Sequence, residues 1–590
     1  MGELWTAAGV IRAADEDMLI GLTDLCVVQV GDQEFLTAAA RGGGWVVGFE
    51  LLSGSGALQE RGGWRIPDHY LQLETTDLIE GPGGQLMLAG LAAEQMLGLP
   101  FLAPGNGSLF GAPVTFETAS TSLSDVSLLT AGDGAGNSLV AFRSGGLAQL
   151  NLDGAGAAHL TSIALSSELQ TAQVDALSWI EQGGRTFAVA AFGPNNTLVS
   201  LTGVPGGSLS VAAELSSGLE DGVWFSHPDA VAVATVGDSI FVVVGASGSG
   251  SLTVLAMDST TGALSPVDHV LDTLETRFAG VTHIATAEYG GATYVVAAGA
   301  DQGLSLLILM PDGHLRYLDS IAGTLDQPLR GITALEVVVT GQGLRVWAAT
   351  ETAPYLMEFS ADLSGQGMQM TASQAGSALT GGEDADVLFG LEGNDTLIGG
   401  AGDDILRDGG GVDFLSGGAG ADVFAFVADG ERDVVTDFDI TRDRLDLSEF
   451  EGSWDLQDLQ VFSRSWGAEL IYHGEVFEIR SLDGSSLDAS DFGPAQFALF
   501  LDRVTPTPIE PGSGHLVGGS GPDLLIGSIE GDFLDGAGGD DRLSGRSGAD
   551  TIYGGSGADI IVGGDGDDSL YGGAGNDVIY GDGASGLSWL

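Results

Sequence analysis

The chain of 590 residues contains no lysine, so all 19 of its basic residues are arginine. Against them stand 81 Asp and Glu residues, and the formal net charge is −62. Such a charge repels nucleic acids and anionic membranes, because binding to phosphate groups needs clustered basic side chains. The same charge attracts divalent cations. The composition therefore excludes a nucleic-acid-binding protein and favours a protein that binds cations.

Cysteine is almost absent. The single Cys26 excludes an intramolecular disulfide, and it lies in the apolar run LCVV. We interpret it as a small core side chain rather than as a nucleophile. A large extracellular protein without disulfides needs another source of stabilisation, and bound metal ions would provide one.

Targeting segments and common catalytic motifs are also missing. The first residues lack a basic region and include Asp15, Glu16 and Asp17, so we expect no secretory signal peptide there. No run of eighteen apolar residues occurs, and we expect no membrane-spanning helix. No HExxH or GxSxG motif occurs. This excludes a zinc protease of the HExxH type and leaves the serine-hydrolase elbow without support.

The C-terminal part instead contains a repeat of nine residues. Seven copies run from Gly518 to Tyr580, and five more in the same phase run from 381 to 425. The sixth place of each copy is an aspartate: Asp386, Asp395, Asp404, Asp413, Asp422, Asp523, Asp532, Asp541, Asp550, Asp559, Asp568 and Asp577. The eighth place is a large apolar residue: Leu388, Leu397, Leu406, Leu415, Phe424, Leu525, Leu534, Leu543, Ile552, Ile561, Leu570 and Ile579.

The residue types of the repeat predict a metal-binding turn followed by a short strand. Glycines at the first, second and fourth places permit a tight turn that points carbonyl groups toward the aspartate. The carbonyl and carboxylate groups would together form a site with only oxygen ligands, the set that suits Ca²⁺. The eighth side chain enters a core that exists only when neighbouring repeats stack. A flexible Gly/Asp-rich linker is the alternative, and the fixed phase of the apolar residue disfavours it.

These repeats resemble the RTX (hemolysin-type) calcium-binding repeats, GGxGxDxUx, of proteins exported by bacterial type I secretion. The resemblance implies a parallel β-roll with two repeats per coil, and several Ca²⁺ ions held between turns two repeats apart. The implied pairs are Asp386–Asp404, Asp395–Asp413 and Asp404–Asp422, and in the second block Asp523–Asp541 through Asp559–Asp577. Asp384 and Glu530 replace a fourth-place glycine and Asp408 replaces a first-place glycine. We expect weaker binding at those turns.

Residues 426–502 resemble the segment that follows the repeats in serralysin-type metalloproteases. That resemblance implies a β-rich cap over the open end of the roll. Its expected buried face consists of Phe424, Phe426, Val434, Phe438, Leu445 and Leu447. We expect linkers at 366–380 and, rich in proline, at 503–514, with a first roll at 381–425 and a second at 515–590. Exported RTX proteins usually have a C-terminal tail without repeats, which contains the secretion signal. In this chain only a short segment follows the second block of repeats. Either the signal is embedded in the repeats, or the chain is shortened, or its export depends on another protein.

Residues 1–365 repeat at a longer period of about 50 residues. Seven units each contain short apolar β-runs joined by Gly/Asp turns, which predicts a seven-bladed β-propeller. The first runs begin near Leu25, Leu78, Val126, Leu177, Val231, Ile284 and Leu335. The last unit lacks its fourth strand, and we expect residues 2–5 to provide it and close the ring. An irregular β-sandwich is the alternative. The predicted class is all-β, with the propeller followed by two β-rolls separated by the cap.

Five aspartates fall at or just before the innermost strands, with His283 at the matching place in unit six: Asp24, Asp77, Asp125, Asp175 and Asp229. They would either hold a cation or polar ligand at one mouth of the channel, or bond nearby backbone amides as turn residues. We favour the second interpretation. The other histidines of residues 1–365 are scattered in predicted loops without metal-ligand spacing: His69, His159, His227, His269 and His314.

These observations predict a secreted protein that folds when calcium binds outside the cell. Its partners would be Ca²⁺ and the type I secretion apparatus. We expect the propeller to be a binding or adhesion module for an extracellular glycan or surface ligand. A lactonase-like or polysaccharide-lyase-like enzyme is the alternative. We favour binding because no compact catalytic motif is found.

Overall fold

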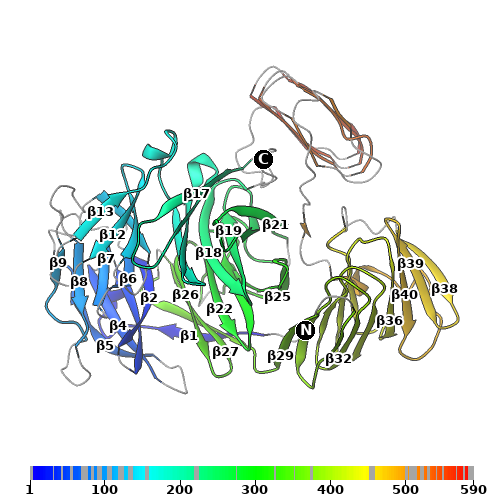
Figure 1. Ribbon diagram of the computed structural model, residues 1–590, viewed down its shortest axis with the longest axis horizontal. Helices are drawn as coiled ribbons and strands as arrows, with labels where there is room; N and C mark the ends of the chain where they lie inside the picture. Colours follow the sequence, from blue (N-terminus) through cyan, green and yellow to red (C-terminus); the bar gives the residue numbers. More distant parts are fainter. Residues whose placement is uncertain are drawn as a thin grey trace.

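A computed structural model describes most of the chain (Figure 1). The described residues are 4–30, 32–40, 44–52, 58–67, 77–81, 85–89, 96–102, 109–116, 125–130, 137–152, 158–217, 225–273, 276–324, 327–350, 353–372, 376–450, 459–498, 502–503, 515–517, 524–527, 532–539, 541–547, 550–557, 559–565, 568–575 and 578–581. Over these ranges the fold is all-β. The helical segments within these ranges are short 3-10 helices: η1 (Glu16–Leu19), η4 (Leu169–Thr171), η5 (Gly193–Asn195) and η7 (Pro494–Gln496). Within the same ranges, no helix has the length and apolarity needed to cross a membrane.

Seven antiparallel sheets form the blades of a β-propeller (Figure 1). Blade 1 consists of β2 (Leu22–Val30), β3 (Gln33–Ala40), β4 (Trp45–Leu51) and β5 (Leu58–Arg65). Blade 2 consists of β6 (Asp77–Gly81), β7 (Gln85–Ala89), β8 (Met96–Pro100) and β9 (Val114–Phe116). Blade 3 consists of β10 (Val126–Thr130), β11 (Asn137–Phe142), β12 (Leu147–Leu152) and β13 (Ala158–Ser162). Blade 4 consists of β14 (Ala176–Gln182), β15 (Arg185–Phe192), β16 (Thr197–Gly203) and β17 (Ser210–Ser216). Blade 5 consists of β18 (Pro228–Val236), β19 (Ser239–Ala246), β20 (Ser251–Met257) and β21 (Leu264–Leu271). Blade 6 consists of β22 (His283–Tyr289), β23 (Ala292–Ala298), β24 (Gly303–Leu309) and β25 (Leu315–Ala322).

Blade 7 closes the ring with a strand from the N-terminus. Its sheet order is β1-β28-β27-β26, with β1 (Trp5–Ile11), β26 (Ile332–Thr340), β27 (Gly343–Thr350) and β28 (Leu356–Asp362). β1 lies antiparallel to β28, and Trp5 is opposite Ala361. The first strand of each blade contacts the first strand of the next, and β2 contacts β26. The predicted innermost strands and N-terminal closure are confirmed, although the closing strand begins at Trp5 rather than at residue 2.

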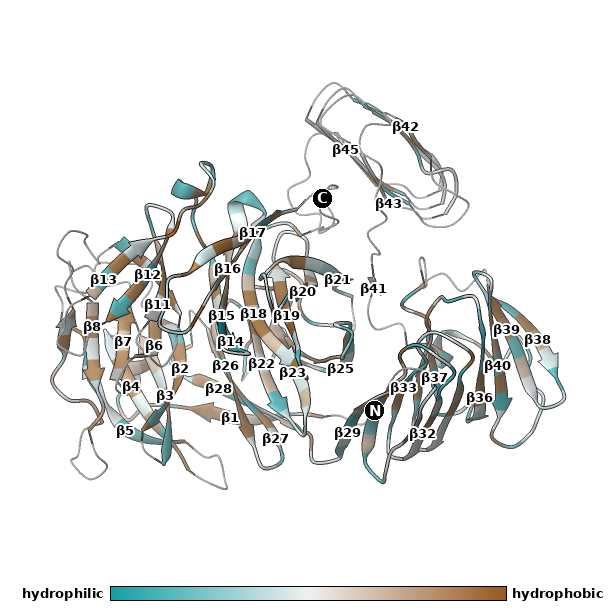
Figure 2. Cartoon of the chain, in the orientation of Figure 1, coloured by the Kyte–Doolittle hydropathy of each residue, from teal (hydrophilic) through white to brown (hydrophobic). Residues whose placement is uncertain are grey.

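The core of the propeller lies between successive blades. Each inter-blade space is filled by a separate cluster of buried apolar side chains, for example between blades 4 and 5 and between blades 5 and 6. The strands of the ring are largely apolar (Figure 2). Cys26 is half-buried and packs against the cluster between blades 1 and 2, in agreement with a core role.

The first roll consists of two parallel sheets whose strands alternate along the chain. One sheet has the order β29-β31-β33-β35-β37 and the other begins β30-β32-β34-β36. Their bounds are β29 (Gln366–Thr371), β30 (Ala378–Thr380), β31 (Ala385–Phe389), β32 (Thr396–Ala401), β33 (Ile405–Arg407), β34 (Phe414–Ala419), β35 (Val423–Ala425), β36 (Arg432–Phe438) and β37 (Arg444–Asp446). Within the nine-residue repeats the partners are eighteen residues apart, so Leu388 pairs with Leu406. The two-repeat coil implied by the RTX resemblance is therefore present.

The roll begins before the first recognisable repeat. Residues 366–380 were expected to form a linker, yet β29 pairs with β31 and β30 pairs with β32. Met370 and Leu379 occupy the eighth-place position of this extra coil and pack against the roll core. The linker prediction is wrong for these strands, because backbone pairing with the next coil requires neither glycine nor aspartate at fixed places.

The cap extends one sheet of the roll. Strands β40 (Glu475–Ser481), β39 (Gly467–Tyr472) and β38 (Gln460–Arg464) continue the β30 sheet beyond β36, with β40 parallel to β36. All six residues of the expected buried face are at most 5% exposed. The rings of Phe426 and Phe477 lie 4.4 Å apart between their centroids.

The second roll also consists of two parallel sheets, β42-β44-β46-β48 and β43-β45-β47-β49. Its strands are β42 (His515–Val517), β43 (Leu524–Ile526), β44 (Phe533–Asp535), β45 (Arg542–Ser547), β46 (Thr551–Ser556), β47 (Ile560–Asp565), β48 (Ser569–Ala574) and β49 (Val578–Tyr580). The eighth-place residues from Leu525 to Ile561 form its core. Ile579 is 45% exposed, because within the described ranges no further coil follows it. The two-residue strand β41 (Asp502–Arg503) pairs with β21 of blade 5.

Candidate calcium sites

The sixth-place aspartates form two ladders along the turns of the rolls. In each step one carboxylate oxygen accepts a hydrogen bond from the backbone N–H of the aspartate eighteen residues earlier. In the first roll, Asp386 donates to Asp404 (2.7 Å), Asp395 to Asp413 (2.6 Å) and Asp404 to Asp422 (2.9 Å). In the second roll the donor–acceptor pairs are Asp532–Asp550, Asp541–Asp559 and Asp550–Asp568. The structure thus brings together six of the pairs that the RTX resemblance implied; the pairs that include Asp523 and Asp577 lie outside the described residues.

In five of these carboxylates the second oxygen is buried and lacks a hydrogen-bond partner in the described part of the chain. This holds for Oδ2 of Asp395, Asp404, Asp413, Asp422 and Asp550, residues that are at most 1% exposed. A buried carboxylate oxygen without a donor carries a desolvation cost that a bound cation would remove. Five such atoms in one repeated position indicate cation sites rather than isolated defects.

Backbone carbonyl groups converge on the same positions. A methyl group added to Gly381 would collide with both Asp386 Oδ2 and the carbonyl oxygen of Gly399. The same arrangement recurs at Gly545, with Asp550 Oδ2 and the carbonyl oxygen of Gly563. The first-place glycine therefore leaves room where carboxylate and carbonyl oxygens from two coils meet. Oxygen-only ligand sets of this kind fit Ca²⁺.

The raised pKa values of several ladder aspartates indicate that their ionised forms would be stabilised by a cation. Burial, together with the neighbouring charges of Asp422 and Asp386, raises the pKa of Asp404 to about 7, against the backbone hydrogen bond that lowers it. Burial likewise raises the pKa of Asp422 to about 7 and that of Asp413 to about 6. Desolvation and like charges both disfavour the ionised form. A divalent cation would reverse this preference.

Both ends of the first ladder extend past the recognisable repeats. Upstream, the N–H groups of Met368 and Ser377 donate to Asp386 and Asp395 as the aspartate N–H groups do elsewhere. Downstream, Asp413 N–H donates to Asp433 (3.0 Å) and Asp422 N–H to Asp443 (3.1 Å). The last two steps span 20 and 21 residues. Asp433 and Asp443 were not among the predicted ligands because they leave the nine-residue phase; the alternation DVVTDF was the available signal for Asp433.

The departures from the repeat have different outcomes. Asp408, at a first place, is fully buried, and its carboxylate accepts hydrogen bonds from the N–H groups of Gly409 and Val427. Burial and the charge of Asp433 raise its pKa. Asp384 lines a groove at the edge of the roll. Asp523, Asp577 and Glu530 lie outside the described residues, so their roles stay predictions.

The aspartates near the propeller mouth bond to backbone groups. Asp125 accepts from the N–H of Ser144, Asp175 from Gly193 (2.9 Å) and Asp229 from Ser247 (3.2 Å), in each case across the loop that follows the second strand of the blade. The carboxylate of Asp24 accepts hydrogen bonds from the backbone N–H groups of Leu25 in blade 1 and Leu78 in blade 2, and so connects the two blades. These contacts agree with the turn interpretation. The side chain of Asp77 lies outside the described part.

The ring nitrogen of His283 lies 2.9 Å from Thr282 Oγ1.

His314, which was not predicted to belong to a site, is part of a cluster of charged side chains. His314 lies with Asp312 and Glu449, and one ligand atom from each falls within 4.8 Å of the others. His314 lies in the turn before β25, as expected, but its partner Glu449 could not be predicted, because Glu449 is 135 residues away in the chain and only the fold brings it close. The same carboxylates accept from Arg407, so the cluster is an ion-pair network, not a cation cage.

Comparisons with known proteins match the C-terminal repeats. The model of the RTX calcium-binding nonapeptide repeat matches four times, over residues 380–411, 389–424, 517–552 and 553–585. No curated protein matches the sequence of this chain.

Two solved structures are similar to part of this chain. The β-propeller domain of Cps50 (Swd1) from Myceliophteria thermophila is 11% identical, with 60% of this chain and 99% of that one covered and a TM-score of 0.41. A putative 6-phosphogluconolactonase from Bacteroides uniformis is 14% identical, with 53% and 85% covered and a TM-score of 0.37. At these values neither structure supports an inference about function. The chain carries RTX calcium-binding nonapeptide repeats in its C-terminal region, behind an N-terminal seven-bladed β-propeller.

Proposed function

We propose that the aspartate pairs of the two rolls hold Ca²⁺ ions between turns eighteen residues apart, and that calcium binding drives the folding of the rolls. In the first roll the pairs are Asp386–Asp404, Asp395–Asp413 and Asp404–Asp422, and Asp433 and Asp443 extend the ladder into the cap. The observation that supports this most directly is the row of buried Oδ2 atoms without hydrogen-bond donors.

Calcium dependence follows from charge and entropy. Without cations the stacked carboxylates repel one another, and glycine-rich turns lose much conformational entropy on folding. Ca²⁺ neutralises the repulsion, and the buried oxygens serve as its ligands. Affinities of extracellular calcium modules, about 10⁻⁴ to 10⁻³ M, would suffice outside a cell.

This behaviour suits export. A cytosol with little free calcium would keep the rolls unfolded, and an unfolded chain can pass through a type I secretion apparatus. Folding would follow in the calcium-rich exterior. The RTX match supports the secreted location, since proteins with these repeats are typically secreted.

For the propeller we propose a binding or adhesion role toward an extracellular glycan or surface ligand. The carboxylates of Asp125, Asp175 and Asp229 already bond to loop backbone, which favours a structural role for them over catalysis. A glycan array probed with the calcium-loaded full chain, beside a lactone-hydrolysis assay, separates this role from the enzymatic alternative.

The calcium proposal is tested by isothermal titration calorimetry of the full chain with CaCl₂ and with MgCl₂. We expect several Ca²⁺ ions to bind at millimolar concentration or below. We expect Mg²⁺ to bind far more weakly, because it demands compact octahedral geometry and keeps its water. The absence of Ca²⁺ binding at millimolar concentration would refute the proposal.

Two adjacent glycines provide a matched test of the ligand geometry. Gly381→Ala would place a methyl group against Asp386 Oδ2 and the carbonyl oxygen of Gly399. In Gly382→Ala the nearest such contact is Asp386 Oδ2 at 3.9 Å. We expect G381A to weaken calcium binding at that turn by about tenfold or more and G382A to change it little. Equal titration curves for the two variants would argue against a cation at this position.

A further inference from the structure

The first roll shares a hydrophobic core with the propeller. One cluster of buried side chains includes Trp5 of β1 and residues of blades 6 and 7, together with Val387, Phe389, Ile405 and Val423 of the roll. Those roll residues stand on β31, β33 and β35, at the seventh and ninth places of alternate repeats. The propeller therefore covers the outer face of one sheet of the roll (Figure 1).

The two sheets of the roll differ in the exposure of equivalent repeat positions. Ile405 is a seventh-place residue of the propeller-facing sheet and is 4% exposed. Phe414 has the same place in the next repeat, on the opposite sheet, and is 44% exposed. Equivalent repeat positions thus differ because only one face of the roll is covered.

A buried ion-pair network crosses the same interface. Arg316 of blade 6 is 4% exposed and donates to Asp446 Oδ2 (2.6 Å), to Ser448 Oγ (3.0 Å) and to Glu449 of the segment after the roll. Arg407 of β33 binds both oxygens of Glu449 (2.9 and 2.7 Å). Burial raises the pKa of Glu449, yet the charges of Arg316 and Arg407 hold it well below its usual value.

The network reaches the turn that precedes β25. Arg407 lies 3.0 Å from Asp312 Oδ2, and Asp312 also bonds His314 (2.7 Å between Oδ2 and Nδ1). Partners from the propeller, from β33 and from the segment after β37 must all be in place for these charges to be satisfied. Removing one partner from a buried network leaves uncompensated charge, which is strongly unfavourable.

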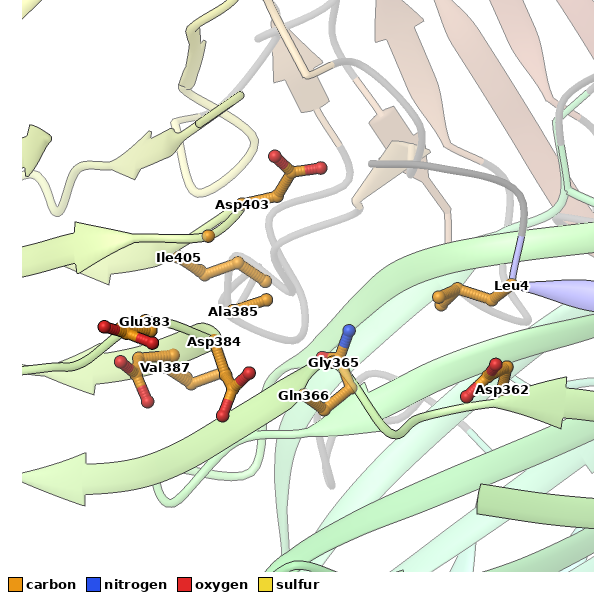
Figure 3. A pocket seen from close by; sticks show the side chains of 12 residues that line it. Leu4, Asp362, Gly365, Gln366, Glu383, Asp384, Ala385, Val387, Asp403 and Ile405 are labelled. Atoms are coloured by element: carbon orange, nitrogen blue, oxygen red, sulfur yellow. The ribbon is translucent and has the colours of Figure 1, made fainter. Parts of the chain in front are cut away.

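An acidic groove lies at the edge of the interface (Figure 3). Asp362 of β28 faces it from the propeller, and Glu383, Asp384 and Asp403 face it from the turns of the roll. The residues that line the groove include no base. Like charges from both parts meet here, so docking is opposed until cations neutralise the turns of the roll.

From these contacts we infer that calcium binding to the first roll controls its docking onto blades 6 and 7 and thereby stabilises the propeller. The inference rests on the proposed calcium-dependent folding of the roll. The surface formed by Val387, Phe389, Ile405 and Arg407 exists only when β31 and β33 are paired. Calcium would therefore act on the ring through this surface, although its proposed sites lie in the roll.

The test is hydrogen exchange of the full chain followed by mass spectrometry, in Ca²⁺ and in EGTA. In the wild type we expect calcium to slow exchange in the roll and also, by about tenfold or more, in β24, β25, β27 and β28. Blades 2 and 3, which lie outside the shared cluster, are the internal reference. Ile405→Asp should retain the calcium effect in the roll and lose it in blades 6 and 7.

Phe414→Asp is the matched control, with the same change at the same repeat position on the exposed sheet. It should keep both calcium effects. A wild type whose roll responds to calcium while blades 6 and 7 do not would overturn the docking inference and leave the calcium proposal intact. A roll without any calcium response would contradict the proposed function itself. Loss of the blade response in F414D as well as I405D would likewise count against docking through this face.

Discussion

Chelation of calcium is expected to open both rolls to trypsin. Because the chain has no lysine, trypsin can cut only after its 19 arginines. Arg407 and Arg542 lie in strands of the first and second rolls, whereas Arg185 lies in β15 of blade 4. In EGTA we expect cleavage after Arg407 and Arg542 to become roughly a hundredfold faster or more, because loss of structural metal unfolds the segments it holds. Cleavage after Arg185 should change much less. Rolls that resist trypsin equally in EGTA would contradict metal-dependent folding.

Acid should partly replace calcium in stabilising the rolls. Burial raises the folded-state pKa of Asp404 and Asp422 to about 7, whereas an unfolded aspartate titrates near 3.9. The folded metal-free roll thus binds more protons than the unfolded chain between these values, and its stability falls as pH rises. The stabilisation from protonation is full below about pH 4 and lost as pH passes through about 7. In EGTA we expect the far-UV circular dichroism of the rolls to be recovered in part at pH 5 and absent at pH 8.

Arg316→Met is expected to produce a large loss of stability. The variant leaves Asp446 and Glu449 buried without one of their guanidinium partners. Removing one member of a buried ion pair typically costs about 3–5 kcal/mol. The measurement is the midpoint of urea unfolding of the full chain in saturating calcium.

Arg480→Met is the control for loss of an arginine charge. Arg480 pairs with Glu478 on the surface of the cap, and its side chain is 45% exposed. Surface pairs contribute about 0–1 kcal/mol, so a small shift is expected. Similar shifts for R316M and R480M would show that the network across the interface adds nothing beyond ordinary surface pairing.

Features with a fixed period could be predicted from the sequence. The eighteen-residue pairing of Asp386 with Asp404 follows from two repeats per coil, and the ring closure by β1 follows from a missing fourth strand in the last unit. Both depend on local residue types that recur at constant spacing. Turn aspartates such as Asp175 were also interpreted correctly, because short carboxylates commonly bond nearby amides.

Features without a period could not be predicted. Met368 and Ser377 act in the ladder only through their backbone N–H groups, so their side chains carry no signal. Asp433 and Asp443 enter at steps of 20 and 21 residues, after the repeat has ended. Arg316 meets Glu449 across 133 residues of chain. Contacts of that kind depend on how two finished domains dock, which no local pattern encodes.

The alternation of strands between two sheets limits how this protein can evolve. Each nonapeptide turns the chain to the opposite side of the roll, so Ile405 faces the propeller and Phe414 faces away. Gain or loss of one repeat between blade 7 and the cap would exchange the two sides and direct a solvent-adapted surface at the ring. Gain or loss of a pair would keep the orientation. Natural variants of this architecture should therefore differ in this region by even numbers of repeats.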